Sequence, residues 1–160
     1  MRPVAVILLL ICLAAAGLTG YLYFTANVTV ADITCVAVDA ADRREVFQEL
    51  KKQTENETFA GTPFDTANLG EAEDYQFYEY TVLLRNKTFV KAEVAEIQVT
   101  PMHGDVLQTA DFRKTDIPAR GEGQVTATIL TAKGTHNVRE LTLTYYLWGL
   151  PFSSRVTYSR

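Results

Sequence analysis

The chain has 160 residues, of which 48% are hydrophobic and 21% are charged. This composition fits one globular domain and excludes a disordered tail or a collagen-like fibre. The formal net charge of −4, without a basic stripe, argues against nucleic acid as a partner.

The first feature along the chain is an uncharged apolar run at residues 4–24, and every charged residue except Arg2 follows it. As a helix, this run is about 31 Å long, which is enough to cross a bilayer core of roughly 30 Å. Tyr21, Tyr23 and Phe24 gather at its end, where interfacial aromatic residues are common. Because Arg2 precedes the run, we predict a cytoplasmic N-terminus and an exported body.

Two interpretations of the run stay open. In the first, residues 1–26 form an uncleaved signal anchor, a single transmembrane helix in the cell membrane, and residues 27–160 form an extracytoplasmic domain. In the second, the segment is a signal peptide, and cleavage near Ala16 secretes a soluble body. We favour the anchor, because cleavage there would leave several large apolar side chains on a soluble N-terminus.

The two cysteines are separated by this organisation. Cys12 lies inside the apolar run and Cys35 lies in the body, so we expect neither an intramolecular disulfide nor a cysteine-based zinc site. Cys35 lies in an apolar run and is best interpreted as a small buried hydrophobe. Asn27, Asn56 and Asn86 each begin an N-x-T triplet, which is an acceptor only in a source that glycosylates exported proteins.

The first part of the body contains a strand, a helix and a long loop. Residues 28–38 are rich in β-branched side chains and predict a strand, with a change of face near Asp32 that suggests a bulge. Residues 42–54 predict the one clear helix, with Asp42 as its N-cap. Residues 55–73 show no period and predict a long loop, which is a candidate partner surface.

The rest of the body is dominated by strands. Apolar and polar residues alternate with a period of two, most clearly after residue 90, and turn residues recur roughly every ten positions. The expected strands cover 74–85, 90–101, 106–113, 124–132, 138–148 and 152–158. Together with the first strand, they predict a mainly β fold: a single Ig-like antiparallel β-sandwich of about seven strands with one short helix.

Two stretches of this pattern resemble a known kind of domain. The segments YTVLLRN-KTF-VKAEVAEIQV and DIPARGEGQVTATI resemble paired strands and a Pro-x-Gly-Glu-type loop of bacterial membrane-anchored Ig-like or fibronectin-like sandwich domains, of the FxLYD or late-embryogenesis-abundant-like plan. The resemblance covers roughly residues 74–160. It implies a sandwich architecture and carries over no functional residue.

Sites for catalysis are not evident. The serines are confined to the last strand, no G-x-S-x-G elbow is present, and His103 and His136 lie beside turn glycines. His103 and Asp105 are spaced like two metal ligands, but a turn explains them equally well. We therefore expect no catalytic residue, no bound metal and no cofactor, and we do not expect an enzyme.

One surface invites a binding role. Thr142, Thr144, Tyr146 and Trp148 share one face of the strand at 138–148, which would present the single tryptophan to a partner if that face is open. The alternative is a central strand covered on both faces. Phe59 and Phe64, in the long loop, complete the candidate partner surface.

These observations favour a membrane-anchored binding or interaction module that contacts another envelope protein or a glycan. The main alternative is a structural subunit of a membrane complex that docks through its transmembrane helix. The small residues Ala14 to Gly17 and Gly20 would permit close packing of that helix. A small envelope enzyme is the third and least favoured hypothesis.

Overall fold

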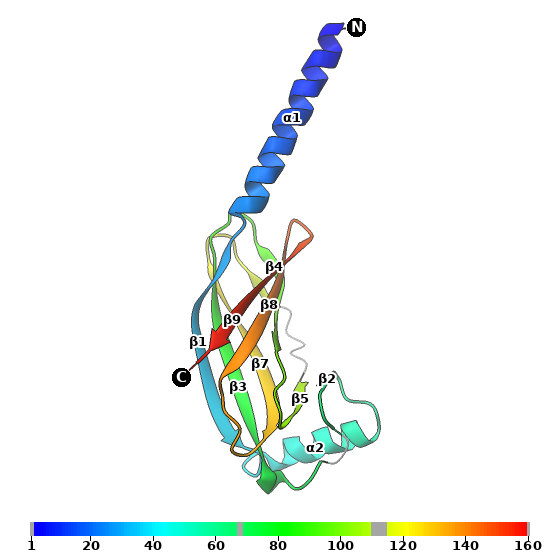
Figure 1. The fold of residues 1–160 in the computed structure, drawn as a ribbon, viewed down its shortest axis with the longest axis vertical. Coiled ribbons are helices and arrows are strands. Elements are labelled where there is room, and N and C mark those ends of the chain that lie inside the picture. Colours follow the sequence, from blue (N-terminus) through cyan, green and yellow to red (C-terminus); the bar gives the residue numbers. More distant parts are fainter. Residues whose placement is uncertain (1, 67–68, 110–114, 160) are drawn as a thin grey trace.

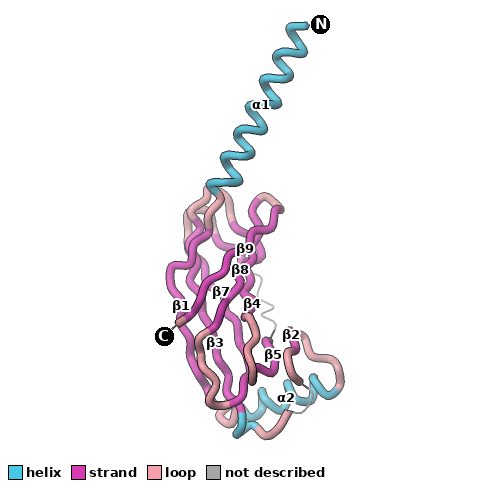
Figure 2. The backbone as a smooth tube through the Cα atoms, in the orientation of Figure 1, coloured by secondary structure: helices cyan, strands magenta, loops and turns pink. Residues whose placement is uncertain are grey.

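The computed structural model describes residues 2–66, 69–109 and 115–159. A long N-terminal helix, α1 (Arg2–Thr25), projects from one end of an elongated β body, and a second helix lies at the opposite end (Figures 1 and 2). We refer to these as the α1 end and the α2 end of the body. The apolar stretch Pro3–Thr25 is long and apolar enough to cross a membrane, and none of it is buried.

The body consists of two antiparallel sheets packed face to face. The first has the strand order β1-β3-β7-β5-β2 and contains β1 (Val28–Asp39), β2 (Gly61–Pro63), β3 (Tyr75–Asn86), β5 (Asp105–Thr109) and β7 (Glu122–Ala132). The second has the order β6-β4-β8-β9 and contains β4 (Ala92–Val99), β6 (Thr115–Ile117), β8 (Arg139–Leu147) and β9 (Leu150–Tyr158). The prediction of a mainly β sandwich is confirmed.

The main core lies between the two sheets, because each strand turns alternate residues inward. Tyr80 and Leu84 of β3 and Ile129 of β7 meet Leu143 and Leu147 of β8, and all five side chains are fully buried. No residue of α1 belongs to this buried cluster. The body therefore closes its core without the N-terminal helix.

Seven of the nine described strands match the predicted ones, and two were missed. β2 falls inside the expected loop 55–73 and pairs with β5, whereas β6 falls between the expected strands 106–113 and 124–132 and pairs with β4. Each is only three residues long, so neither shows a readable alternation. The expectation of an unstructured loop at 55–73 is thus wrong in part. The expected strand at 106–113 is described only as far as Thr109.

The predicted bulge in the first strand is present. The register of β1 against β3 shifts between Val30 and Asp32, after which Ile33 pairs with Val82. The extra residue lets Val28 and Ile33, which have opposite parity, both pack against the main core.

The second helix, α2 (Arg44–Glu55), starts two residues later than predicted. Asp42 does not cap it, because two successive turns carry the chain into the helix and Arg43 occupies the N-cap position without a side-chain cap. Phe47 and Leu50 are buried against a second, smaller cluster, to which Phe77, Leu107 and Leu130 belong. The short 3-10 helix η1 (Ala72–Asp74) follows the loop and leads into β3.

Candidate functional site

The predicted binding strand has one buried and one half-exposed face. Leu141, Leu143, Tyr145 and Leu147 of β8 are buried in the main core, while Thr142, Thr144 and Tyr146 point outward and are half-buried. The helix α2 lies at the far end of the body rather than over this sheet (Figure 1). The alternative of a strand covered by α2 is therefore not what the structure shows.

Neighbouring strands extend this outward row into a polar surface, which we call the polar sheet face. Thr144 lies between Glu96 of β4 and Ser153 of β9, and Thr142 lies between Gln98 and Arg155. Hydroxyl, amide and charged groups thus stand side by side across three strands. Such a surface offers many hydrogen-bond donors and acceptors but little apolar area.

Trp148 lies apart from the polar sheet face. β8 ends at Leu147, which pairs with Leu150 of β9, so Trp148 and Gly149 form a two-residue turn at the α1 end. The Trp148 ring packs against Phe89, with 6.2 Å between centroids, and both side chains remain exposed. Sequence reasoning placed Trp148 on the strand and missed Phe89 and Leu150. The Gly after Trp148 was the signal for the turn.

Phe59 and Phe64 are only partly exposed. Phe59 is half-buried against the second cluster, and Phe64 is half-buried against the main core. The backbone N–H groups of Phe64 and Asp65 both donate to the carbonyl oxygen of Val106. These bonds hold this part of segment 55–73, which was predicted to be a loop, against β5. Both aromatic side chains therefore stabilise the fold and do not join the polar sheet face.

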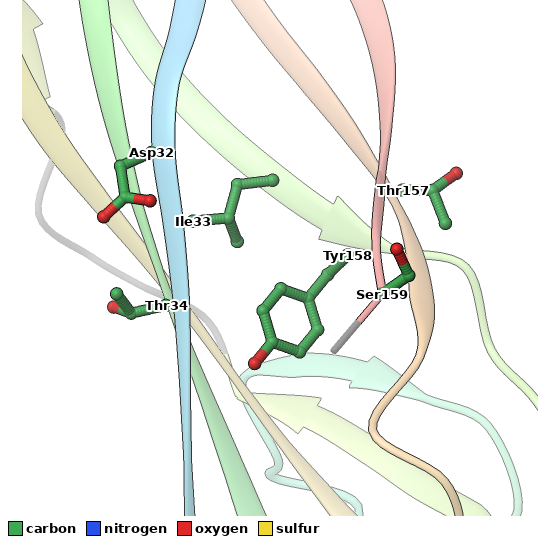
Figure 3. Close-up of a pocket in the computed structure, with 6 residues that line it drawn as sticks. All are labelled: Asp32, Ile33, Thr34, Thr157, Tyr158 and Ser159. Carbon is green, nitrogen blue, oxygen red and sulfur yellow. The ribbon is translucent and has the colours of Figure 1, made fainter.

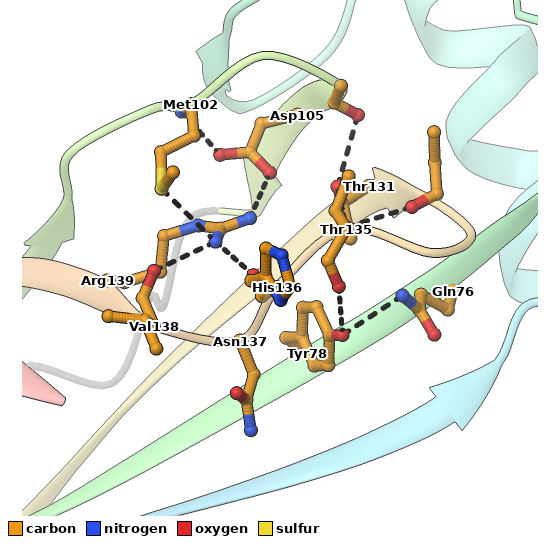
Figure 4. A network of polar contacts seen from close by, with 12 residues as sticks. Gln76, Tyr78, Met102, Asp105, Thr131, Thr135, His136, Asn137, Val138 and Arg139 are labelled. Carbon is orange, nitrogen blue, oxygen red and sulfur yellow. Dashed lines mark hydrogen bonds and ion pairs between the residues drawn. The ribbon is translucent and has the colours of Figure 1, made fainter. Parts of the chain in front are cut away.

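A buried ion pair occupies the α2 end of the body (Figure 4). Arg139 Nη2 lies 2.7 Å from Asp105 Oδ1, and both side chains are completely buried. Met102 N–H donates to the other carboxylate oxygen at 2.7 Å, while Arg139 Nη1 donates to the carbonyl oxygens of His136 and Val138. Arg139 Nε has no partner among the described residues. Asp105, considered above as a metal ligand, is thus engaged by an arginine.

The remaining chemistry-bearing residues are dispersed. The side chains of His103 and His136 are exposed at the α2 end. In the described part of the chain, no group of three or more His, Cys, Asp or Glu side chains is arranged to hold a metal ion. Burial raises the pKa of the Cys35 thiol, despite a hydrogen bond with Tyr80 that acts in the opposite direction. The thiol therefore stays protonated at neutral pH, which is the unreactive form.

An open cleft of about 510 Å³ lies where the edge strands β1 and β9 approach each other (Figure 3). Its six lining residues are Asp32, Ile33, Thr34, Thr157, Tyr158 and Ser159. Ile33 and Tyr158 point into the space between the two strands, whereas Asp32 and Thr157 point away from it (Figure 3). The convergent side chains are thus apolar or aromatic, and they close the edge of the sandwich.

The three N-x-T triplets differ in accessibility. Asn86 is 1% exposed, and its amide nitrogen donates to the carbonyl oxygens of Val90 and Pro118 at 2.7 and 3.1 Å. Its amide oxygen accepts from Thr88, so the side chain is a structural element of the β3–β4 connection. Asn27 and Asn56 are exposed, but Asn27 lies only two residues beyond α1. Asn56 is therefore the triplet best placed as an acceptor.

Comparison with known proteins adds little. No family model matches the chain, and no curated protein matches it. Among solved structures, the chain is similar to the cupredoxin domain of amoB from Nitrosocaldus yellowstonii, with 15% sequence identity over 81% of this chain and 84% of that chain and a TM-score of 0.36. A similarity at this level assigns no family, ligand or activity, and the fold rests on the two sheets themselves.

Proposed function

We propose that this protein is a single-pass membrane protein whose β-sandwich acts as a binding module on the extracytoplasmic side. One observation carries the proposal: no part of the apolar stretch Pro3–Thr25 is buried, and the body completes its core without it. An apolar helix of this length is stable in a bilayer and costly in water. Only Ala26 and Asn27 separate it from β1, so the body would stand directly on the membrane.

For the binding surface, we propose the polar sheet face around Thr142, Thr144 and Tyr146. Its half-exposed hydroxyl and amide groups suit a hydrogen-bonding partner, either another envelope protein or a glycan. Binding is favoured over catalysis, because the Cys35 thiol is kept protonated by burial and the Asp105 carboxylate is engaged by Arg139.

The anchor is tested with paired substitutions at the centre of α1. Changing Leu9 and Leu13 to arginine introduces two charges, each costing about 2.5–3.5 kcal/mol at a helix centre in the membrane. We expect this variant to be lost from carbonate-washed membranes, whereas the matched change of both residues to alanine stays with them. Extraction of the wild-type chain by carbonate, or its recovery as a shorter secreted chain cleaved near Ala16, would contradict the anchor.

The binding surface is tested with matched threonines on the two sheets. Thr144 of β8 and Thr128 of β7 are both half-buried and outward-facing, one on each sheet. In mild-detergent purifications, a partner that binds the polar sheet face should be lost with Thr144→Arg and retained with Thr128→Arg. A partner retained by Thr144→Arg but lost when Gly17 and Gly20 are changed to leucine would instead favour docking through α1.

A further inference from the structure

We propose that the α1 end of the body rests in the interfacial layer of the same bilayer that α1 crosses. The contact is made by an apolar tip that we define as Phe89, Trp148 and Leu150, with Lys87 and Arg120 beside it. This inference rests on the proposed membrane anchoring of α1 and adds a second contact between the protein and the lipid.

The connection between α1 and the body is short, so the α1 end of the body, which carries the tip, lies close to the membrane. α1 ends at Thr25 and β1 begins at Val28, and two intervening residues span at most about 7 Å. The connection is also held in place, because Lys87 N–H donates to the carbonyl oxygen of Asn27 at 3.0 Å.

Aromatic contacts hold the C-terminal end of α1 against the β8–β9 hairpin, which also carries Trp148 and Leu150 of the tip. The ring of Tyr23 packs against Phe152 of β9, with centroids 5.2 Å apart, and Phe152 stacks on Tyr145 of β8 at 5.7 Å. The β8–β9 turn, which carries Trp148, lies at the α1 end of the body beside the helix (Figure 1). The tip therefore faces the surface from which the helix emerges.

The chemistry of the tip suits the boundary between headgroups and acyl chains. Phe89, Trp148 and Leu150 are 58%, 41% and 47% exposed, although each is large and apolar. Tryptophan and other aromatic side chains concentrate at membrane interfaces, where the ring meets apolar material and the indole N–H meets water. In water, the same exposed cluster would be an unfavourable surface.

The backbone at the tip indicates that Trp148 is there for a reason other than turn formation. Trp148 and Gly149 have φ values of +52° and +75°, which matches a two-residue hairpin turn with two left-handed residues. Glycine, asparagine and aspartate favour such positions, whereas a bulky side chain at positive φ is an outlier. A strained residue of this kind points to a role outside the fold.

The charges beside the tip complement lipid phosphates. Lys87 and Arg120 are exposed, and within the described part of the chain neither takes part in an ion pair. The nearby acidic residues are already paired: Glu122 with Arg85, and Glu93 and Asp116 with Lys91. A net positive charge thus remains at this end of a chain whose formal net charge is −4.

The single tryptophan makes the contact directly measurable. The full chain is reconstituted in vesicles of phosphatidylcholine and phosphatidylglycerol, and Trp148 fluorescence is recorded with lipids brominated near the top of the acyl chains. We expect blue-shifted emission, strong quenching by the brominated lipid, and protection from iodide present on both sides. Water-like emission that iodide quenches and brominated lipid does not would overturn the inference.

A matched control moves the reporter to the other end of the body. In the variant Trp148→Phe/Val46→Trp, the tryptophan occupies an exposed position of α2, and we expect water-like emission without quenching by brominated lipid. Flotation of the same vesicles separates the two proposals. If the wild-type chain floats with the vesicles and Trp148 reports water, the tip contact is wrong and the anchor stands. If the chain does not float, both are overturned.

Discussion

At the α2 end of the sandwich, the helix α2 covers a cluster that includes Phe77, Leu107 and Leu130, whereas at the α1 end two large aromatic side chains, Phe89 and Trp148, remain exposed. Both ends belong to the same two sheets, so the difference is not a matter of strand composition. At the α2 end the aromatic side chain Phe47 is buried by residues of its own chain, and the exposed apolar side chains, such as Val46 and Met102, are not aromatic. At the α1 end the exposed aromatic residues lie beside an apolar helix of which no part is buried, and this arrangement is expected where a membrane supplies the missing contacts.

The two ends also differ in the burial of their ion pairs. The Arg139–Asp105 pair at the α2 end is completely buried, and the Arg85–Glu122 pair at the α1 end is about half-exposed. A buried charge that loses its partner is costly, whereas a solvated pair contributes little. The α2 end should therefore dominate the stability of the body.

The largest expected effect comes from breaking the buried pair. Asp105→Leu leaves the Arg139 guanidinium uncompensated and should lower the free energy of unfolding by about 3–5 kcal/mol. Adding Arg139→Met should recover part of that loss, because the second buried charge is also removed. Arg85→Met at the α1 end is the matched control and should cost less than about 1 kcal/mol. Urea titrations of the full chain in mild detergent measure all three, and equal losses for Asp105→Leu and Arg85→Met would disprove the contrast.

Replacing an aromatic residue with alanine should also lower the stability much more at the α2 end than at the α1 end. Phe47 of α2 is fully buried, so Phe47→Ala should lower the free energy of unfolding by about 3–5 kcal/mol. Phe89 is 58% exposed, so Phe89→Ala should change the stability in detergent by about 1 kcal/mol at most. The same urea titrations apply. A loss with Phe89→Ala as large as that with Phe47→Ala would mean that the α1 end is a core and not an open surface.

A smaller effect of opposite sign is expected at the tip. Trp148→Asn places Asn-Gly in the hairpin turn, the sequence best suited to two left-handed residues. Relief of the positive φ at Trp148 should raise the stability of the body in detergent by roughly 0.5–1 kcal/mol, offset in part by the lost contact with Phe89. Thermal unfolding followed by circular dichroism measures the shift. A lower melting temperature would show that Trp148 serves the fold itself.

The smallest effect on stability at neutral pH comes from two ionisable groups in the core, Cys35 and Tyr80. This effect becomes larger at alkaline pH. Burial raises the pKa of both the Cys35 thiol and the Tyr80 hydroxyl above their ordinary values of 9.0 and 10.0. The neutral forms are therefore favoured in the folded state, and their contribution is complete below pH 9 and is lost as the pH rises beyond it. The melting temperature should fall above pH 9, and Cys35→Ala/Tyr80→Phe should flatten that fall. An unchanged slope in the variant would assign the alkaline loss to other groups.

The sequence predicted the parts of the fold that repeat a period. The alternation of Leu141, Leu143 and Leu147 with threonines is imposed by burial of one face, so β8 and its inward side were predictable. The N-terminal helix was equally predictable, because a long uncharged apolar run is typical of a membrane-spanning helix. The missed strands β2 and β6 are each three residues long and exist only through pairing with distant partners.

The site was less predictable, because it depends on contacts between separate segments. The alternation allowed Trp148 to be either the last residue of the strand or the first residue of the turn. Because β8 ends one residue earlier than predicted, at Leu147, Trp148 lies at the tip and not on the polar sheet face. Its contact with Phe89 joins two turns far apart in the chain, as the pair between Arg139 and Asp105 joins two strands. Periodicity within a segment carries no information about such pairs.

The most direct measurement is the topology of the full chain in a translation reaction supplemented with microsomes. Asn56 is exposed and directly follows α2, which lies at the end of the body opposite α1 (Figure 1), so it reports which side of the membrane the sandwich occupies. We predict a membrane-integrated chain of full length that carries a glycan, loses it with Asn56→Gln but not with Asn86→Gln, and is protected from added protease. An integrated but unglycosylated chain whose body is digested by the protease would contradict an extracytoplasmic sandwich.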